Sequence, residues 1–192
     1  TAVRATSWED APAADGLVLL TVKQTALTPE FLDRLAAFVP VGSEVALFQN
    51  GIGHADKLRA ALPNRHIVPA VTTEGALRIG PTTVRHTGRG DTRVAVSGLL
   101  ERSLVQAGFS VILSNKLEDD IMRKLLINAV INPLTALLRT RNGQLPASQE
   151  RLGLMRTLFD ETFEIVQACG FAEEREAMWQ SVLAVCENTK HN

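Results

Sequence analysis

"LEDDIMRKLLINAVINPLTALL" (117–138) is the stretch at which the pattern of the sequence changes. Before it, short apolar runs rich in β-branched residues alternate with helical patterns, and after it we find helical patterns only. The sequence therefore predicts an α/β half, residues 1–116, followed by an all-helical half, residues 117–192. This order is typical of a nucleotide-binding domain followed by a helical domain, with a ligand cleft between them.

Three polar side chains, Lys124, Asn128 and Asn132, interrupt this apolar stretch at a spacing of four residues. Four residues bring an α-helix nearly back to the same face, so the three side chains form one polar stripe. The stripe needs water, hydrogen-bonding partners or a ligand, because burying unpaired polar groups costs free energy. Pro133 lacks a backbone N–H, so we expect the helix to kink or break beside Asn132. A buried helix with one satisfied polar seam would explain the same pattern without any function.

Two continuous apolar runs, "GLVLLTV" (16–22) and "EVALFQ" (44–49), are typical of buried parallel strands. Between them, Thr28 as N-cap and Pro29 at the first helical position predict a helix over 28–39. Further along the chain we expect a helix at 54–63, a strand at 66–79, a hairpin at 82–98 that turns at "GRGD", a helix at 99–108 and a strand at 109–114.

Charge and hydropathy exclude some classes of partner. The net charge is −1 at pH 7, so we expect no binding to nucleic acid. No apolar run reaches the length that we would require of a membrane span, so we expect no membrane partner. The first residues are polar and mixed, which is not the pattern of a signal peptide.

Cysteine and histidine usage points to a reducing compartment without a metal centre. We expect Cys169 and Cys186 to be buried, reduced thiols on helices, which indicates the cytoplasm. No group of histidine, cysteine and acidic residues has metal-ligand spacing, so we expect no metal site. The four histidines are scattered and are interpreted as surface or structural residues: His54, His66, His86 and His191.

Polar residues follow the predicted strands at the points where the strands end. Lys23 follows the first strand, and Asn50 follows the second, beside Gly51 and Gly53. Ligands of open α/β sheets bind outside the carboxyl ends of the strands, and the glycines allow close approach of a ligand to the backbone. An ordinary strand-to-helix turn would also explain "NGIG". "TTEGA" (72–76) adds hydroxyl groups at a third strand end.

These segments together resemble a known family. The order and spacing of six segments are similar to those of the ketopantoate reductase family, the NADPH-dependent 2-dehydropantoate 2-reductases and their relatives: "LVLLTVKQ", "ALFQNGIG", "VTTEGA", "MRKLLINAVINPLTALL", "RNGQL" and "ENTKHN". The pattern K-x-x-x-N-x-x-x-N-P is the most specific of these elements. The resemblance implies a partial Rossmann-type cofactor domain followed by part of a helical domain for substrate binding and dimerisation, with a homodimer formed through the latter.

The resemblance also implies roles for individual residues. Lys124 corresponds to the lysine that protonates the ketone oxygen of a 2-keto acid, and Asn128 and Asn132 correspond to substrate-binding asparagines. Lys23 and Asn50, with Gly51 beside it, correspond to the cofactor side of the site, so the implied cofactor is NADPH. The implied reaction reduces 2-dehydropantoate to pantoate in pantothenate and coenzyme A biosynthesis.

The phosphate-binding pattern G-x-G-x-x-G is absent from the sequence, since "GIGHAD" lacks the third glycine. In the family this loop precedes the point that resembles Thr1, and further substrate contacts follow the point that resembles Asn192. We therefore expect the sequence to represent the middle of such an enzyme and to bind NADPH poorly by itself. A related NAD(P)-dependent reductase of another 2-keto acid or a polyol, and a non-catalytic fragment, are the alternatives.

Overall fold

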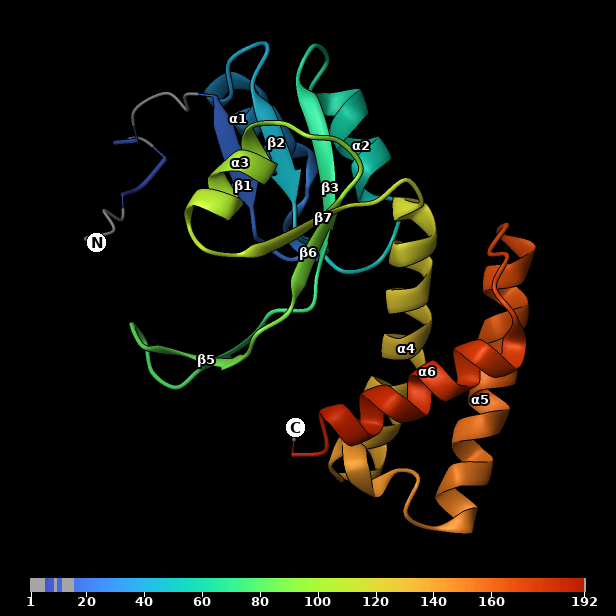
Figure 1. Cartoon of the computed structure of the whole chain (residues 1–192). Helices are drawn as coiled ribbons and strands as arrows, with labels where there is room; N and C mark the ends of the chain where they lie inside the picture. The colour runs from blue at the N-terminus through green and yellow to red at the C-terminus, as the bar shows by residue number, and fades with distance from the viewer. Residues whose placement is uncertain (1–5, 9, 12–15, 192) are drawn as a thin grey trace. The chain divides into compact units, whose positions relative to one another are not determined.

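The computed structural model describes residues 6–8, 10, 11 and 16–191 (Figure 1). The chain divides into two compact units, Thr1–Asn115 and Lys116–Asn192. The first unit is α/β and the second is helical, so the predicted fold class is confirmed.

The first unit is built on a five-stranded sheet in the order β1-β2-β3-β6-β7. Its strands are β1 (Leu17–Leu20), β2 (Glu44–Leu47), β3 (His66–Thr72), β6 (Asp91–Val94) and β7 (Ser110–Leu113). β1, β2 and β3 are parallel, β6 runs antiparallel to β3, and β7 runs parallel to β6. The connecting helices are η1 (Gln24–Ala26), α1 (Pro29–Phe38), α2 (His54–Ala61) and α3 (Leu99–Gln106). Parallel strands joined by helices make this unit Rossmann-like.

Helices cover both faces of this sheet, as the burial of β2 shows. Val45 and Leu47 belong to one core cluster, together with buried leucines of α1 and α2. Ala46 lies between them in the sequence and belongs to a second cluster, with Leu100 of α3. Successive side chains of a strand point to opposite faces, so a strand covered on both faces becomes a continuous apolar run. This confirms the interpretation of "EVALFQ" as a buried parallel strand.

The predicted start of α1 is also confirmed. Thr28 is the N-cap, and its hydroxyl oxygen accepts a hydrogen bond from the backbone N–H of Phe31 at 3.3 Å. Pro29 occupies the first helical position, where its missing N–H removes no intrahelical bond.

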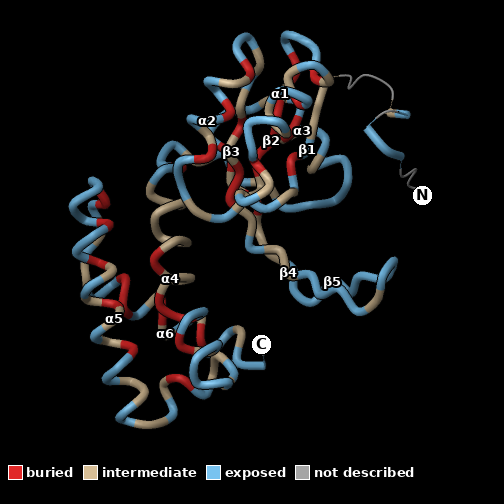
Figure 2. Tube along the Cα trace, turned by 180° about the vertical axis from the view of Figure 1, so that it is seen from behind, coloured by how far each residue is buried: buried red, intermediate tan, exposed pale blue. Residues whose placement is uncertain are grey.

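The predicted strand at 66–79 and the predicted hairpin at 82–98 are wrong. The first splits into β3 and β4 (Gly75–Arg78), and β4 pairs antiparallel with β5 (Val84–Gly88) in a separate, largely exposed ribbon (Figure 2). The ribbon turns at 79–83, where the N–H of Ile79 donates to the carbonyl oxygen of Thr83 at 3.0 Å.

"GRGD" therefore lies between β5 and β6, opposite Thr73, rather than at the hairpin turn. The N–H of Asp91 donates to the Thr73 hydroxyl oxygen at 2.9 Å, and the N–H of Thr73 donates to the carbonyl oxygen of Asp91. A Cβ at Gly90 would lie 2.5 Å from the carbonyl carbon of Thr73, so this close passage requires a glycine.

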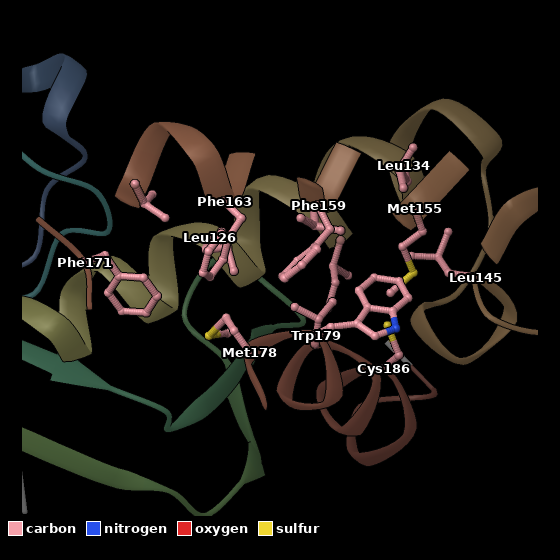
Figure 3. Packing of buried hydrophobic residues seen from close by; sticks show 14 residues of the cluster. Leu126, Leu134, Leu145, Met155, Phe159, Phe163, Phe171, Met178, Trp179 and Cys186 are labelled. Carbon is pink, nitrogen blue, oxygen red and sulfur yellow. The ribbon is translucent and has the colours of Figure 1, made fainter. Parts of the chain in front are cut away.

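The second unit contains α4 (Leu117–Leu138), η2 (Asn142–Gln144), α5 (Gln149–Ala168) and α6 (Arg175–Asn188). No strand is assigned between residues 116 and 191, as the sequence predicts. The three long helices meet in one apolar core (Figure 3). Its largest fully buried side chains are Phe159, Phe163, Leu126, Ile131, Leu145, Met155 and Met178.

The sequence predicts a kink or a break of the helix beside Pro133, and the break is not observed: α4 continues through this residue to Leu138. Proline removes one backbone hydrogen bond from a helix. Ile131 and Leu134 flank it and are buried in the core, and this burial offsets the lost bond.

The expectation about membrane spans also needs correction. α4 is long and apolar enough to cross a membrane by length and composition alone. Such a helix is weak support for a span, since core helices of globular proteins have the same composition. Here Leu126, Val130, Ile131 and Leu134 pack into the core of the helical unit.

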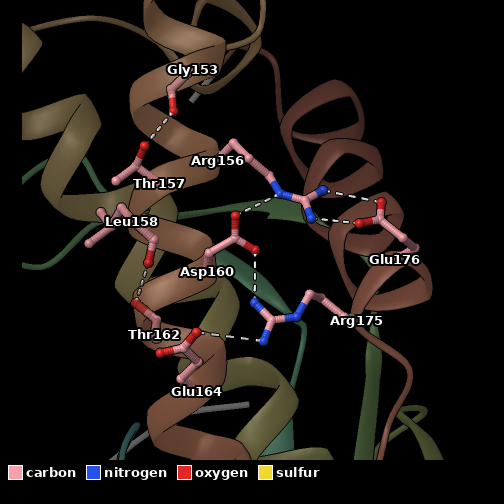
Figure 4. Close-up of polar contacts among 9 residues, drawn as sticks. All are labelled: Gly153, Arg156, Thr157, Leu158, Asp160, Thr162, Glu164, Arg175 and Glu176. Carbon is pink, nitrogen blue, oxygen red and sulfur yellow. Dashed lines mark hydrogen bonds and ion pairs between the residues drawn. The ribbon is translucent and has the colours of Figure 1, made fainter.

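Ion pairs join α5 to α6 on the outside of this core (Figure 4). Arg156 donates hydrogen bonds to Asp160 and Glu176, and Arg175 donates to Asp160 at 3.0 Å. The bond from Arg156 is the main reason that the pKa of Asp160 is lowered, with the bond from Arg175 adding to it. The guanidinium of Arg156 also lies 5.2 Å from the centre of the Trp179 ring. The network fixes how α6 packs along α5.

The cysteine prediction is half right. Cys186 is buried in α6, and burial raises its pKa to about 11. Cys169 is exposed, because it lies at the C-terminal cap of α5, where the helix leaves the core.

Candidate functional site

A pocket of about 530 Å³ opens at the carboxyl edge of the parallel strands. Residues 21–25, which follow β1, and residues 48–52, which follow β2, line it. β1 and β2 are neighbours in the sheet, so the segments that follow them meet at the same edge. The structure therefore brings Lys23, Asn50 and Gly51 together around one pocket.

The segment "TTEGA" is not among the residues that line this pocket. Thr72 ends β3, and its side chain pairs with the hydroxyl of Thr92 on β6 at 3.0 Å. The hydroxyl groups at this strand end therefore bond β3 to β6 at the point where the chain leaves the sheet for the exposed ribbon.

A hydrogen-bonded contact joins the two segments that line the pocket. Gln24 Nε2 donates to the carbonyl oxygen of Asn50 at 2.6 Å and lies 2.9 Å from Nδ1 of His54. His54 is the first residue of α2 and is buried, with 7% of its surface exposed. Burial is the main cause of its lowered pKa, so the imidazole is neutral at pH 7.

Gly51 holds the turn that follows β2. Its φ of +93° lies in the region that favours glycine, and a Cβ there would lie 2.8 Å from Gln24 Nε2. A side chain at this position would therefore displace Gln24 from Asn50 and His54.

We expect Gly51→Ala to destabilise the protein more than Gly53→Ala does. Gly53 also has a positive φ, of +85°, but a Cβ added there meets nothing within 4 Å. The Gly53→Ala variant therefore measures the cost of the strained backbone conformation alone. That strain costs about 1–2 kcal/mol at either position, and the lost contacts of Gln24 add about 1–2 kcal/mol at Gly51. Urea unfolding of both variants measures the difference. Equal destabilisation would mean that Gln24 does not occupy the space beside Gly51.

Lys23 supplies the charge of the pocket. Among the ten lining residues in the described part of the chain, it is the one that is charged at pH 7. Its side chain is exposed at the pocket rim, next to Gln24. This arrangement suits an anionic or hydroxyl-rich ligand.

The polar stripe lies on α4 in the second unit. Lys124 and Asn128 are half-buried and Asn132 is exposed. All three belong to one continuous helix, so their spacing of four places them along one side of it. Burial lowers the pKa of Lys124 below 10.5. The predicted site residues thus form two separate groups. Lys124, Asn128 and Asn132 lie along one helix of the second unit, and Lys23, Asn50 and Gly51 line one pocket of the first.

Each unit matches a family model in comparisons with known proteins. The family model described as "Ketopantoate reductase PanE/ApbA" matches residues 2–113, and its companion, "Ketopantoate reductase PanE/ApbA C terminal", matches residues 116–192. The chain belongs to the ketopantoate reductase family. The resemblance that the sequence motifs indicate is therefore confirmed.

Individual relatives agree with this family. A 2-dehydropantoate 2-reductase of Bacillus subtilis (strain 168) is 33% identical over 185 residues, which cover 92% of the chain and 59% of that relative. A family member from Ralstonia eutropha JMP134 superposes with a TM-score of 0.81 at 26% identity, over 92% of the chain and 59% of that structure. A D-mandelate dehydrogenase, solved with NADH and anilino(oxo)acetate, shares the fold with a TM-score of 0.78 at 21% identity. The match covers 94% of the chain and 60% of that structure. The chain thus spans about 60% of the length of these relatives.

Sequence reasoning missed the contact between Gln24, which lines the pocket, and His54, which lies behind it in α2. Both lie in quoted segments, Gln24 at the end of "TVKQ" and His54 directly after "NGIG", 30 residues apart. A glutamine in a turn and a histidine at a helix start carry no local signal of pairing. Their contact follows from the parallel pairing of β1 with β2, which places the two turns side by side.

Proposed function

We propose that the full-length protein reduces 2-dehydropantoate to pantoate with NADPH, a step of pantothenate and coenzyme A biosynthesis. The observation that carries the proposal is the half-buried Lys124, with its lowered pKa, on the same side of α4 as Asn128 and Asn132. Membership of the ketopantoate reductase family supports the same reaction.

The pocket of the first unit fits the cofactor side of this reaction. When bound, NADPH supplies the hydride that reaches the keto carbon. The ammonium of Lys23 offers a charge to a phosphate group or a donor to a ribose hydroxyl. Asn50 would offer amide hydrogen bonds to the nicotinamide ribose. Gly51 lines the same pocket, so its backbone can contact the ligand.

Lys124 supplies the proton. Addition of hydride to the keto carbon leaves negative charge on the keto oxygen, and a proton must reach this oxygen to give the alcohol. A positioned ammonium group stabilises that charge and donates the proton from Nζ. Its lowered pKa makes Lys124 a stronger acid than an exposed lysine, so proton transfer to the oxygen is easier.

Asn128 and Asn132 bind the substrate. They lie one and two helical turns from Lys124, so their amides can reach other polar groups of the same small molecule. Amides can bond the hydroxyl or the carboxylate of the substrate without adding a charge that competes with the developing oxyanion.

We propose that the protein works in the cytoplasm and assembles as a homodimer through the helical unit. Leu137, Leu154 and Ile165 are exposed apolar residues of α4 and α5. Contact with a second apolar surface would remove these side chains from water. A second copy of the chain is the partner that we propose for these helices.

We expect the full-length protein to oxidise NADPH in the presence of 2-dehydropantoate. The loss of NADPH absorbance measures this reaction. The matched control is 3,3-dimethyl-2-oxobutanoate, which lacks only the substrate hydroxyl. Its kcat/KM should be lower by more than about 10²-fold, because a site that bonds a hydroxyl rejects an analogue without one. Equal values for the two keto acids would indicate a reductase of another 2-keto acid.

A further inference from the structure

We propose that Gln24 and His54 are positioning residues of the pocket: His54 orients the Gln24 amide, which in turn holds the Asn50–Gly51 turn in the shape that binds the cofactor. We call this contact the Gln24–His54 clamp. The inference rests on the proposed function, because it assigns the pocket of the first unit to NADPH. It gives roles to two residues outside the set that the sequence motifs indicate.

The amide of Gln24 has one orientation that fits its surroundings. Its Nε2 carries two N–H groups, and two acceptors lie within reach, the carbonyl oxygen of Asn50 at 2.6 Å and Nδ1 of His54 at 2.9 Å. Rotating the amide by half a turn would place Oε1 against the carbonyl oxygen of Asn50, an arrangement of two acceptors. The clamp therefore fixes both the position and the direction of the amide.

The ring of His54 must accept this hydrogen bond at Nδ1, so its proton lies on Nε2. A proton on Nδ1 would face the N–H groups of Gln24. Two features keep the ring neutral: it is buried, and it begins α2, where the positive end of the helix dipole disfavours an added positive charge. Burial is the larger effect, because the pKa of His54 is lowered although a hydrogen bond to the backbone of Ile52 raises it.

The clamp acts on the pocket through the backbone of the turn. Gln24 holds the carbonyl group of Asn50, and it fills the space that a side chain at residue 51 would need. With the carbonyl held, the planar peptide between Asn50 and Gly51 is fixed, and so is the direction of the Gly51 N–H. Without the clamp the turn can relax, and a small displacement of contact groups weakens binding.

The first experiment detects the clamp without any ligand. Nitrogen NMR of the histidine rings at pH 7 should show His54 with its proton on Nε2 and with Nδ1 as a hydrogen-bond acceptor. Gln24→Met keeps the size of the side chain but removes the donor, so the Nδ1 signal should move to that of a free acceptor. A wild-type ring that is protonated on Nδ1 would overturn the proposal.

The second experiment measures NADPH binding by the full-length protein. Gln24→Met and His54→Phe should raise the Kd for NADPH about tenfold, the effect of about one lost hydrogen bond. His54→Asn is the conservative variant, because its Oδ1 lies near the position of Nδ1 and can accept the same bond. It should keep the Kd within about threefold of the wild-type value.

The pattern across the variants separates positioning from general stability. A structural role alone would lower the melting temperature of all three variants and leave the Kd of the folded protein unchanged, which would overturn the proposal. The titration uses no keto acid. A protein that binds NADPH but does not reduce 2-dehydropantoate would contradict the proposed function and leave the comparison of Kd values intact.

Discussion

Replacing Lys124 by alanine in the full-length protein is expected to lower kcat for 2-dehydropantoate by about 10²–10⁴-fold, the usual contribution of a positioned proton donor. Folding should survive, because Lys124 lies on the polar side of α4 and is not a member of the apolar core. Steady-state kinetics and a melting curve on the same preparation test both statements. Near-normal turnover would contradict the assignment of Lys124 as the general acid.

Two control variants separate proton transfer from binding. Asn128→Ala removes an amide contact but not the proton source, so it should act mainly on the KM for the keto acid. Lys57→Ala removes an exposed lysine of α2, outside the pocket, and should leave kcat unchanged. A fall in kcat for Lys57→Ala as large as that for Lys124→Ala would indicate a general effect of charge.

The pH profile gives an independent check of the same role. A general acid must be protonated, so kcat should fall as the pH rises through the pKa of Lys124. Burial lowers this pKa below 10.5, so the fall should begin at a lower pH than it would for an exposed lysine. In Lys124→Ala this basic limb should disappear from the profile.

The sequence predicts those elements whose formation depends on local pattern. The buried strand β2 and helix α1 follow from an apolar run and from the capping residue Thr28, and the structure confirms both. In β1 only Leu20 is buried and Leu19 is 49% exposed, so the prediction of a buried strand is wrong there. The stripe on α4 follows from helical periodicity. The family resemblance rests on the same segments, and the matches to both family models confirm it.

The features that sequence reasoning missed depend on contacts between distant segments. Glu44 begins β2 and its carboxylate accepts hydrogen bonds from the N–H groups of Leu99 and Leu100, so it caps α3 from 55 residues away. The clamp joins Gln24 to His54 in the same way. "GRGD" has the composition of a turn, but its place opposite Thr73 is set by the pairing of β3 with β6. Pro133 also shows that local sequence alone does not decide the structure. The packing of its neighbours outweighs the preference of proline to end a helix.

The helical unit allows the sharpest test of the fold. Phe159 of α5 has no exposed surface, and its ring lies 5.6 Å from that of Phe163 and 5.2 Å from that of Trp179. Phe159→Ala should lower the free energy of unfolding by about 3–5 kcal/mol, through lost apolar burial and the cavity that remains. This is a large share of the ~5–15 kcal/mol that stabilises a typical domain.

The control for this prediction lies on the same helix. Gln167 is exposed, so Gln167→Ala should change the free energy of unfolding by no more than about 0.5 kcal/mol. The sequence contains two tryptophans, Trp8 in the first unit and Trp179 in the core of the second. In a Trp8→Phe background, fluorescence during urea unfolding therefore reports the helical unit alone. A loss below about 1 kcal/mol for Phe159→Ala would contradict the packing of α5 against α6. The same core buries Leu126 and Val130 of α4, so this measurement also tests whether a folded unit holds the helix that carries Lys124 and Asn128.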